Sequence, residues 1–376
     1  MESGDGPKIL VVNPGSTSTR VALFVGETDQ CSATLPAPHS DSQTDLWDEF
    51  PARLMGIRGW LAQEGIEKAE LSAVVGRGGL LRPVEGGTYL VTEAMLADAW
   101  GNRQGSHASN LGCALARALA DEASRDRTGL SPKGPGQATF SGGAIPAFVV
   151  DPVSTDEFGE LARYSGLREI PRTSLSHALS IHALVKEACR REGRRVEGSR
   201  FVVAHLGGGI SVSPVADGRI MDANNANSDG PFSPTRAGGL PTQEFLAFCL
   251  SGKHTLRGLR EMTVKRGGLV SYLGTDDARE VEGRIDRGDS EARMVYEAMA
   301  YQIAKEIGAM ATVLNGEVDR ILLTGGLAAS DLLTAWIRKR VEFLAPVEVL
   351  PEVEEMKALA LGALRVLDGE VEAKEY

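Results

Sequence analysis

The chain has 376 residues, which is too long for one ordinary hydrophobic core and predicts two domains. Hydrophobic residues make up 42% of the sequence, aromatic residues only 5%, and glycine occurs 44 times, which favours an α/β protein over an aromatic-rich β-sandwich. The formal net charge is −11 and there is no basic stripe or arginine-rich arm, which argues against nucleic-acid binding. An acidic chain can still bind phosphate, because such a site depends on its local surroundings.

The cysteines and the first residues predict where the protein is found. The four cysteines lie far apart, form no C-x-x-C motif and have no zinc-type spacing to histidine, so we expect reduced thiols in an intracellular protein. The opening residues, MESGDGPK, lack the pattern of a signal peptide, and no apolar run approaches the roughly 20 residues that span a bilayer. We therefore expect a cytoplasmic protein that makes no membrane contact.

After a loose tail at residues 1–7, the apolar pattern predicts strands alternating with amphipathic helices. Strands are predicted at 8–13, 20–25, 72–76, 145–150, 201–205, 210–215, 219–222 and 320–324. Helices are predicted at 45–64, 107–123, 155–164, 175–191, 241–251, 290–315, 329–345 and 355–368. Ser290 is the expected N-cap of the clearest helix, 290–315. Residues 124–143, rich in Gly, Pro, Ser and Thr, are expected to form a surface loop.

Three turns of small residues each follow an apolar strand, at 13–19, 207–211 and 324–327. Any one of them is most simply a turn, because Gly, Asn, Pro and Ser favour turns for conformational reasons. Such a turn can also aim backbone N–H groups and hydroxyls at a phosphate without side-chain bulk or negative charge. Three in one chain favour nucleotide binding.

Arg77, Arg236 and Asp151 are the candidates for phosphoryl chemistry. Arg77 directly follows the strand at 72–76, and Arg236 lies in the loop GPFSPTRAGG, so glycines flank both. An arginine can bind phosphate or carboxylate with two parallel hydrogen bonds, although a solvated surface charge is the alternative for each. Asp151 ends a predicted strand and precedes Pro152, where a carboxylate can hold Mg²⁺ or simply cap a turn.

Three histidines lie near these motifs: His107, His177 and His205. Each can bond a phosphate or substrate oxygen, whereas His182 lies on a predicted helix and is interpreted as structural. None is assigned a proton-transfer role, because a carboxylate acceptor is already ionised at neutral pH and needs no general base.

Six stretches occur in order from residue 8 onward: ILVVNPGSTSTRVALF, VVGRGGLLRPVEGGTY, IPAFVVDPVSTDEF, VAHLGGGISVSPVADGRIMDANNA, GPFSPTRAGGLP and ILLTGGLA. Together they resemble the butyrate kinases and branched-chain fatty-acid kinases of the acetate kinase family, within the actin/sugar-kinase/Hsp70 superfamily. The resemblance implies an α/β fold of two ribonuclease-H-like domains with mixed β-sheets flanked by helices, and ATP and Mg²⁺ in the cleft between them. The domains would span 1–152 and 153–354, with a last helix at about 355–376 packing back on the first.

The resemblance also implies roles for individual residues. Arg77 and Arg236 match the two arginines that hold the substrate carboxylate and the transferring phosphoryl group. Asp151 matches the catalytic, metal-linked aspartate, and Glu355 matches a late glutamate associated with Mg²⁺, although Glu354 beside it is an alternative. The remaining matches are His107 at the active site, Asn13, Ser16 and Ser18 in the first phosphate hairpin, Gly207, Gly208 and Gly209 in the second with His205 before them, and Gly325 and Gly326 in the adenosine motif.

The chain departs from acetate kinases at three places. Gly208 replaces an asparagine of the second phosphate hairpin, and Thr173 stands at about the position of an active-site histidine, for which Ser174 or His177 could substitute. Gly78-Gly79 replaces bulky valines. We hypothesise that these glycines open a pocket for a C4 or branched acyl chain, and that Gly79→Val shifts preference toward acetate or propionate. Burial of each added methylene contributes about 0.8 kcal/mol.

The resemblance implies the reaction butanoate + ATP ⇌ butanoyl phosphate + ADP, by direct in-line transfer to the carboxylate. A kinase for isobutyrate, propionate or acetate is an alternative, and a non-catalytic nucleotide-binding regulator on the same fold is a more distant one. The apolar helix at 290–315 and the self-association typical of the family predict a homodimer or a higher homo-oligomer.

Overall fold

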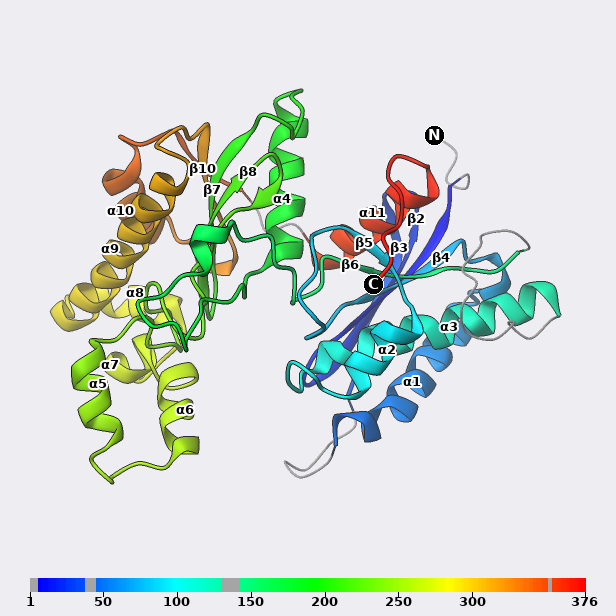
Figure 1. The fold of residues 1–376 in the computed structure, drawn as a ribbon, viewed down its shortest axis with the longest axis horizontal. Coiled ribbons are helices and arrows are strands. Elements are labelled where there is room, and N and C mark those ends of the chain that lie inside the picture. The colour runs from blue at the N-terminus through cyan, green and yellow to red at the C-terminus, as the bar shows by residue number, and fades with distance from the viewer. Residues whose placement is uncertain (1–5, 38–44, 130–142, 351–353) are drawn as a thin grey trace. The chain divides into compact units, whose positions relative to one another are not determined.

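The computed structural model describes residues 6–37, 45–129, 143–350 and 354–376. The chain forms two compact units, in each of which Figure 1 shows a β-sheet with helices packed against it. The first unit comprises Met1–Thr155, Ala178–Ser180 and Val353–Tyr376, and the second comprises Asp156–His177 and Ile181–Glu352. The domain boundaries expected from the sequence, at 152 and 354, stay a prediction.

In the described residues, the first unit is built on a six-stranded mixed sheet with strand order β3-β2-β1-β4-β6-β5. The strands are β1 (Lys8–Pro14), β2 (Ser18–Val25), β3 (Thr28–Pro36), β4 (Ala73–Arg77), β5 (Thr88–Leu90) and β6 (Ala147–Val150). β1 runs antiparallel to β2 and parallel to β4, which in turn runs parallel to β6. The central strands β1 and β4 are buried along nearly their whole length, which explains their continuous apolar sequence.

Helices cover both faces of this sheet (Figure 1). They are α1 (Phe50–Gln63), α2 (Glu93–Trp100), α3 (Leu111–Thr128) and α11 (Glu355–Leu367), with 3-10 turns at Leu46–Glu49, Lys68–Glu70 and Ala108–Asn110. α3 packs on β4, β6 and β1, and α11 packs on β1, β4 and β6. The last helix therefore returns to the sheet that the first strands form.

In the described residues, the second unit has a five-stranded mixed sheet with order β11-β10-β7-β8-β9. The strands are β7 (Arg200–Leu206), β8 (Ile210–Ala216), β9 (Arg219–Ile220), β10 (Arg320–Thr324) and β11 (Val347–Val349). Asp217 and Gly218, between β8 and β9, have φ angles of 53° and 78°. Two left-handed residues are typical of the tight hairpin that the sequence predicted at this Asp-Gly pair.

In the second unit, α7, α8 and α10 pack on the long helix α9. The helices assigned to this unit are α4 (Ala178–Arg191), α5 (Thr242–Cys249), α6 (Leu256–Val264), α7 (Gly268–Leu273), α8 (Ala278–Asp286), α9 (Ser290–Val313) and α10 (Asp331–Val341), with 3-10 turns at Glu160–Arg163 and Gly326–Ala329. The first three residues of α4, Ala178–Ser180, are grouped with the first unit. α9 contacts α8, α10, β7 and β8, and its buried apolar side chains form the centre of this unit's core.

The sequence missed the strands β3, β5 and β11 and the helices α2, α6, α7 and α8. β3 is an edge strand that is half-buried on one face only, so its polar sequence carries no apolar run. Two expectations were wrong: the segment 155–164 contains only the 3-10 turn Glu160–Arg163, and Asp289 rather than Ser290 caps α9, through a hydrogen bond from the Ala292 N–H.

The expected loop at 124–143 was wrong at its start, because α3 continues to Thr128. The segment 130–142 lies outside the described residues. Within the ranges that the structure describes, no helix combines the length and the apolar character needed to cross a bilayer.

Candidate active site

The first phosphate hairpin joins β1 to β2 and is held from within the protein by a buried arginine. Gly15 N–H donates to Ser18 O at 2.8 Å, which closes the turn. Arg53 of α1, with a side chain only 1% exposed, donates to Gly15 O at 2.9 Å and to Thr19 Oγ1 at 2.7 Å. Glu49 Oε2 accepts from Arg53 Nη2 at 2.6 Å and balances its charge. Ser16 stays exposed at the tip, while Ser18 is half-buried.

Asn13, Arg77 and Glu355 converge at the buried end of β1 and β4. Arg77 Nη1 forms an ion pair with Glu355 Oε1, and Asn13 Nδ2 donates to Glu355 Oε2 at 2.9 Å. Burial alone would raise the pKa of Glu355, but the charge of Arg77 and the hydrogen bonds from Arg77 and Asn13 outweigh it and hold the pKa below its usual range. Glu355, not the exposed Glu354, therefore faces Arg77 as a carboxylate.

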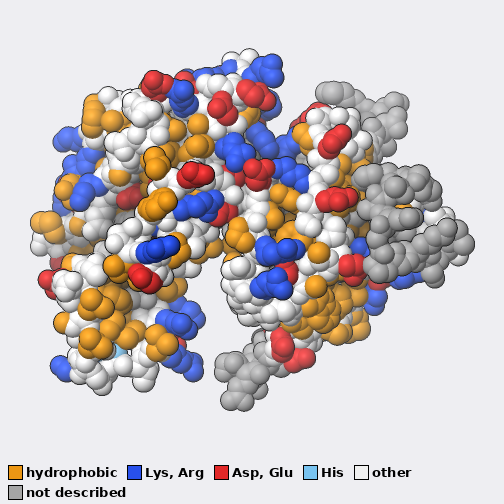
Figure 2. All heavy atoms as spheres, viewed as in Figure 1, with side chains coloured by type: hydrophobic (Ala, Val, Ile, Leu, Met, Phe, Trp, Pro, Cys, Tyr) orange, Lys and Arg blue, Asp and Glu red, His pale blue; other side chains and the backbone are white. Residues whose placement is uncertain are grey.

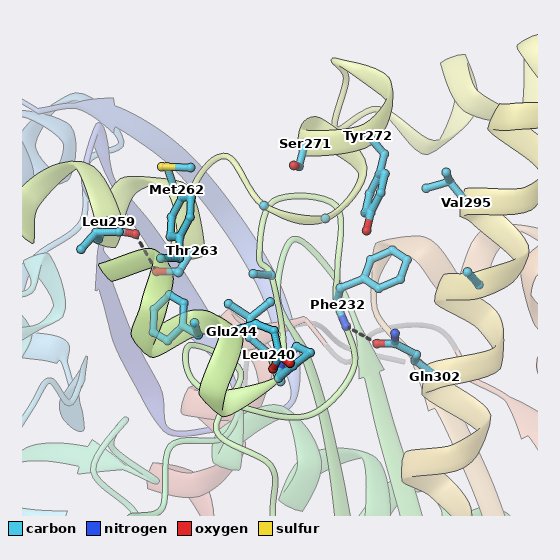
Figure 3. A pocket seen from close by; sticks show the side chains of 18 of the residues that line it. Phe232, Leu240, Glu244, Leu259, Met262, Thr263, Ser271, Tyr272, Val295 and Gln302 are labelled. Carbon is cyan, nitrogen blue, oxygen red and sulfur yellow. Dashed lines mark hydrogen bonds between the residues drawn. The ribbon is translucent and has the colours of Figure 1, made fainter. Parts of the chain in front are cut away.

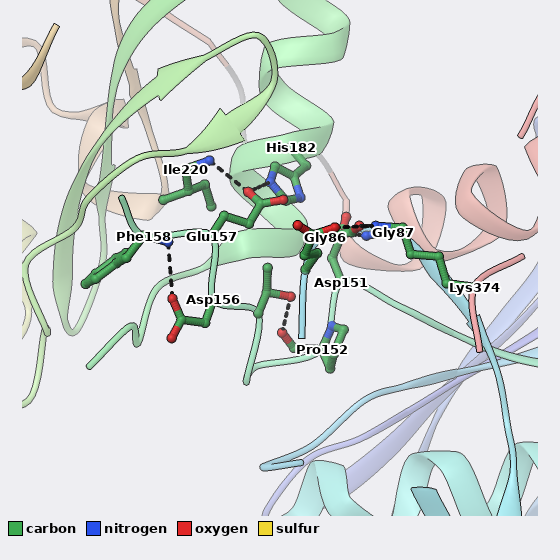
Figure 4. Close-up of polar contacts among 12 residues, drawn as sticks. Gly86, Gly87, Asp151, Pro152, Asp156, Glu157, Phe158, His182, Ile220 and Lys374 are labelled. Atoms are coloured by element: carbon green, nitrogen blue, oxygen red, sulfur yellow. Dashed lines mark hydrogen bonds and ion pairs between the residues drawn. The ribbon is translucent and has the colours of Figure 1, made fainter. Parts of the chain in front are cut away.

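Asp151 directly follows β6, as the sequence predicted, and is 6% exposed. Its φ angle of 39° is uncommon for a residue with a side chain. Gly87 N–H donates to Asp151 Oδ1 at 2.7 Å, and Asp151 N–H donates to Gly87 O at 3.0 Å (Figure 4). This reciprocal pair fixes both the backbone and the carboxylate of Asp151.

His107 begins the 3-10 turn before α3, where its Nδ1 accepts the Ser109 N–H at 3.2 Å. Desolvation, followed by the positive charge of Arg77, lowers the pKa of His107. Both effects favour a neutral imidazole, and its Nε2 then carries the proton because Nδ1 accepts a hydrogen bond. His107 is thus an uncharged donor near Arg77.

The pocket hypothesised at Gly78-Gly79 was wrong. A Cβ on Gly78 would lie 2.4 Å from Val149 Cγ1, and a Cβ on Gly79 would lie 2.1 Å from Asn110 Oδ1 and 2.6 Å from Asn110 Cα. The glycines therefore let the chain after β4 pack against the turn before α3 and against β6, and they leave no open space for an acyl chain. Gly79→Val would disturb the packing of the first unit before it could change substrate preference.

The second phosphate hairpin, Gly207–Gly208–Gly209, joins β7 to β8 and packs directly against Arg236. Gly207 N–H donates to Gly209 O at 3.2 Å. A Cβ on Gly209 would lie 2.2 Å from Arg236 Nη1, so only glycine lets the guanidinium rest there. A Cβ on Gly208 would meet nothing within 4 Å, which leaves space beside the hairpin for a phosphate.

Two hydroxyls tie the Arg236 loop to the hairpin. Ser233 Oγ and Thr235 Oγ1 both donate to Gly208 O, the latter at 3.0 Å, and Ser233 Oγ also accepts the Arg236 N–H at 3.2 Å. Burial, which disfavours charge, lowers the pKa of Arg236, although a guanidinium stays protonated in proteins. The half-buried Arg236 guanidinium therefore rests on Gly209, and the hydrogen bond from the Arg236 N–H to Ser233 fixes the backbone that carries it.

His177 and His205 stack face to face at the base of this hairpin, with ring centroids 3.9 Å apart. His177 Nδ1 lies 2.9 Å from Ser211 Oγ on β8. In register, His205 pairs with Ser211 on one side and Thr324 on the other, so a polar row crosses three strands beneath the turn.

Gly325 follows β10 with a φ angle of 89°, and a Cβ there would lie 2.5 Å from Leu206 O. The close approach brings Gly325-Gly326 beside the end of β7, where the glycine hairpin begins. The structure thus gathers 207–209, Arg236, His177, His205 and 325–326 in the second unit. Asn13, Ser16, Ser18, Arg77, His107, Asp151 and Glu355 lie in the first unit.

Comparison with known proteins places this geometry in a family. A sequence profile of the acetokinase family matches residues 172–350. Probable butyrate kinase 2 of Caldanaerobacter subterraneus subsp. tengcongensis is 47% identical over 371 residues, which is 98% of this chain and 99% of the relative. A probable butyrate kinase of Listeria monocytogenes is 44% identical over the same shares of both chains. The chain belongs to the acetokinase family.

Solved structures agree with the predicted fold class. The crystal structure of Porphyromonas gingivalis acetate kinase superposes with a TM-score of 0.75 at 18% identity, over 96% of this chain and all of that chain. A propionate kinase from Francisella tularensis gives a TM-score of 0.70 at 18% identity, over 94% and 98%. The expected α/β fold with two mixed sheets flanked by helices is confirmed.

Local sequence does not distinguish some of the side chains that support this candidate site. Arg53 lies on a predicted helix, four residues after Glu49, and looks like an ordinary helix ion pair until the fold places it under the hairpin. Ser233 and Thr235 belong to the GPFSPTRAGG loop, from which only Arg236 was chosen. His182 was interpreted correctly as structural: it is buried and its Nε2 lies 3.1 Å from Glu157 Oε2 (Figure 4).

Asp151 and Glu355 are suited to Mg²⁺, which binds one or two protein carboxylates and completes its shell with water and substrate phosphates. Glu355 is held ionised by its neighbours. In the part of the chain that the structure describes, no three His, Cys, Asp or Glu side chains lie together as a ready-made ligand set.

Proposed function

We propose that this protein is a butyrate kinase that transfers the γ-phosphoryl group of ATP to butanoate. The observation that carries the proposal is the match along 98% of the chain to relatives named probable butyrate kinases. In the reaction, a carboxylate oxygen forms the new bond to the γ-phosphorus while the bond to the ADP oxygen breaks. The carboxylate is already ionised at neutral pH, so no base is needed.

The second unit binds ATP and stabilises the moving phosphoryl group. The backbone N–H groups of Gly208 and Gly209 meet the phosphates, and 325–326 meets the adenosine. Arg236, resting on Gly209, neutralises charge that develops on the phosphoryl oxygens, an effect that contributes roughly 3–4 kcal/mol per positioned donor. His177 rather than Ser174 takes the place of the missing histidine, because it is held against the base of the hairpin.

The first unit binds the acid and the metal. Arg77, which holds the Glu355 carboxylate, is suited to orient the butanoate carboxylate, and the neutral His107 donates a hydrogen bond to a substrate oxygen. Asn13, Ser16 and Ser18 meet the transferring phosphate. Asp151 and Glu355 would hold Mg²⁺ directly or through water, and the metal would neutralise charge on the phosphates when bound.

A substrate panel tests the proposal. Acyl phosphate is trapped as its hydroxamate with acetate, propionate, butanoate, isobutyrate and valerate, each with ATP and Mg²⁺. We expect the highest kcat/KM with butanoate. A clear preference for isobutyrate, propionate or acetate would replace butanoate as the substrate. ATP binding without acyl phosphate from any acid would refute the enzyme and leave a nucleotide-binding regulator.

We also propose that the protein is cytoplasmic and self-associates through one face of α9. The four cysteines are free thiols, which a reducing compartment would keep reduced. Met294 and Tyr301 on α9 are 72% and 50% exposed. Beside them lies a mainly apolar pocket of about 720 Å³ between α5, α6, α7 and α9 (Figure 3), and Figure 2 shows hydrophobic side chains gathered over α5 and α7.

Light scattering after size-exclusion chromatography tests this self-association. We expect Met294→Glu to shift a dimer or larger assembly toward the monomer, because a charge in an apolar contact is costly to bury. Leu161→Glu is the matched control, since Leu161 is an exposed apolar residue of the same unit, outside this face. A monomeric wild-type protein would contradict the proposal.

A further inference from the structure

The segment 368–376, which follows α11, returns to the edge of the first sheet. Lys374 N–H donates to Thr88 O at 2.8 Å, and Leu90 N–H donates to Lys374 O at 3.0 Å. Lys374 therefore pairs with Tyr89 in the manner of one residue of a parallel strand beside β5. Because β5 is an edge strand, this pairing covers backbone groups that would otherwise be open.

The side chain of Lys374 crosses the turn that precedes β5. Its Nζ donates to Gly86 O at 2.8 Å and lies 3.4 Å from Glu85 Oε2. A Cβ on Gly87 would lie 3.2 Å from Lys374 Cε, so the aliphatic stem rests directly on Gly87, whose φ angle is 140°. The amine fixes Gly86 and the stem fixes Gly87 (Figure 4).

Gly87 is also the partner of Asp151, through the two reciprocal hydrogen bonds of 2.7 and 3.0 Å. One continuous series of contacts thus runs from Lys374 through the Gly86-Gly87 turn to the Asp151 carboxylate. Both glycines can adopt many backbone conformations, so the turn needs an external contact to keep one of them. Lys374 provides that contact.

A second contact anchors the same segment. Tyr376 Oη donates to Asp98 Oδ2 at 2.8 Å and accepts the Arg82 N–H at 2.8 Å. The Arg82 guanidinium lies over the Tyr376 ring, 4.7 Å from its centroid. The backbone of Lys374 is therefore held by its pairing with β5, and the chain end beyond it is anchored by Tyr376. These contacts fix the position of Lys374, unlike that of a typical surface lysine.

We propose that Lys374 is a positioning residue for Asp151. It holds the Gly86-Gly87 turn, and the turn holds the carboxylate in the orientation needed for phosphoryl transfer. The inference rests on the proposed function, in which Asp151 would hold Mg²⁺ directly or through water. Lys374 is not among the residues proposed to contact substrate or metal, and the nearest of these along the chain, Glu355, lies 19 residues before it.

Steady-state kinetics of Lys374→Met and Lys374→Arg test the proposal. Lys374→Met keeps the aliphatic stem on Gly87 but removes the bond to Gly86 O, so we expect kcat to fall about tenfold, the size of one lost hydrogen bond to a charged group. The KM values for butanoate and ATP should change less than about twofold, because Arg77 and the glycine hairpins are unaffected. The Mg²⁺ concentration for half-maximal rate should rise.

Lys374→Arg should recover most of the rate, and Glu375→Ala, an exposed neighbour, should match the wild type.

A double-mutant cycle with Asp151→Asn separates this inference from the proposed function. If Lys374 acts through Asp151, Lys374→Met should lower kcat in the wild type but not further in Asp151→Asn. Equal losses in both backgrounds, or a fall in kcat with matching rises in both KM values, would indicate a general structural role and overturn the inference. A fully active Asp151→Asn would instead refute the role proposed for Asp151. An inactive Asp151→Asn with a fully active Lys374→Met would refute the inference alone.

Discussion

The two phosphate hairpins have the same topology but are supported by different chemistry. The β1–β2 hairpin rests on a buried ion pair, in which Arg53 binds the hairpin carbonyls and Glu49 balances its charge. The β7–β8 hairpin rests on neutral hydroxyls, since Ser233 and Thr235 donate to a single glycine carbonyl. In the first hairpin the charge of Arg53 lies beneath the turn, and in the second the Arg236 guanidinium lies against it.

The difference suggests a division of tasks. A buried ion pair is expensive to break, so the first hairpin should be rigid and its loss should be felt as instability. Hydroxyl contacts are worth less individually, so the second hairpin should depend on the exact shape that glycine permits beside Arg236. Substitutions beneath the first hairpin should therefore cost mainly stability, and substitutions beside the second should cost mainly turnover.

The largest effect is expected from Arg53→Ala. The substitution leaves Glu49 buried without its guanidinium partner and removes the donors to Gly15 and Thr19, so the first unit should lose about 3–5 kcal/mol of stability. Tryptophan fluorescence during urea unfolding reports it, because Trp47 and Trp60 lie in this unit.

The matched control for Arg53 is the double substitution Arg53→Met with Glu49→Gln. It removes both charges while keeping most of the volume, so it should be clearly more stable than Arg53→Ala. If Arg53→Ala alone unfolds at the wild-type urea concentration, the ion pair does not support the hairpin.

The second prediction concerns Gly209→Ala, which adds one methyl group against Arg236. The new Cβ must push the flexible guanidinium aside, since the two would otherwise lie 2.2 Å apart, while the fold can stay intact. Loss of a positioned donor lowers kcat by roughly 10²–10³-fold. Gly239→Ala, in the loop that carries Arg236, is the control, because its Cβ would make only ordinary contacts, with Gly230 O at 3.7 Å and Gly230 N at 4.0 Å. Equal activity of the two variants would contradict the contact.

Local sequence predicted the central strands of both sheets. Continuous apolar runs identified β1, β4, β7 and β10, because central strands are buried on both faces. Edge strands such as β3 and β11 carry no such run, and short surface helices such as α6 and α7 have little core to contact. Their positions depend on neighbours that lie far away in the chain.

Local sequence singled out candidate site residues by type, but it did not reveal the residues that support them. Arg77, Asp151 and Arg236 stand out because they end strands or lie among glycines. That Glu355 pairs with Arg77 depends on α11 packing across β1 and β4, more than two hundred residues later in the chain. The pocket predicted at Gly78-Gly79 was wrong for the same reason. The sequence shows that side chains are missing there, but only the fold shows that Asn110 fills the space beside Gly79.

A smaller effect should distinguish the two hydroxyls of the second hairpin. Ser233 Oγ bonds both Gly208 O and the Arg236 N–H, whereas Thr235 Oγ1 bonds only Gly208 O among these groups. Ser233→Ala should therefore lower kcat about thirtyfold and Thr235→Val about fivefold, in line with roughly 1 kcal/mol for each hydrogen bond. The order of the two kcat values decides the point, and a larger loss in Thr235→Val would contradict it.

The smallest effect is the pH dependence that Glu355 adds to the first unit. Its pKa is lower in the folded protein than in the unfolded chain, so its ionised form stabilises the fold above the unfolded pKa of about 4.3. This contribution is lost as the pH falls through the folded value. Wild type should therefore exceed Glu355→Gln in stability by at most about 1 kcal/mol at pH 7, since the pair is partly exposed, and the gap should close toward pH 3.5. Urea midpoints without Mg²⁺, followed by the same tryptophan signal, measure it. A gap that widens in acid would show that the ionised Glu355 carboxylate does not stabilise the first unit through Arg77.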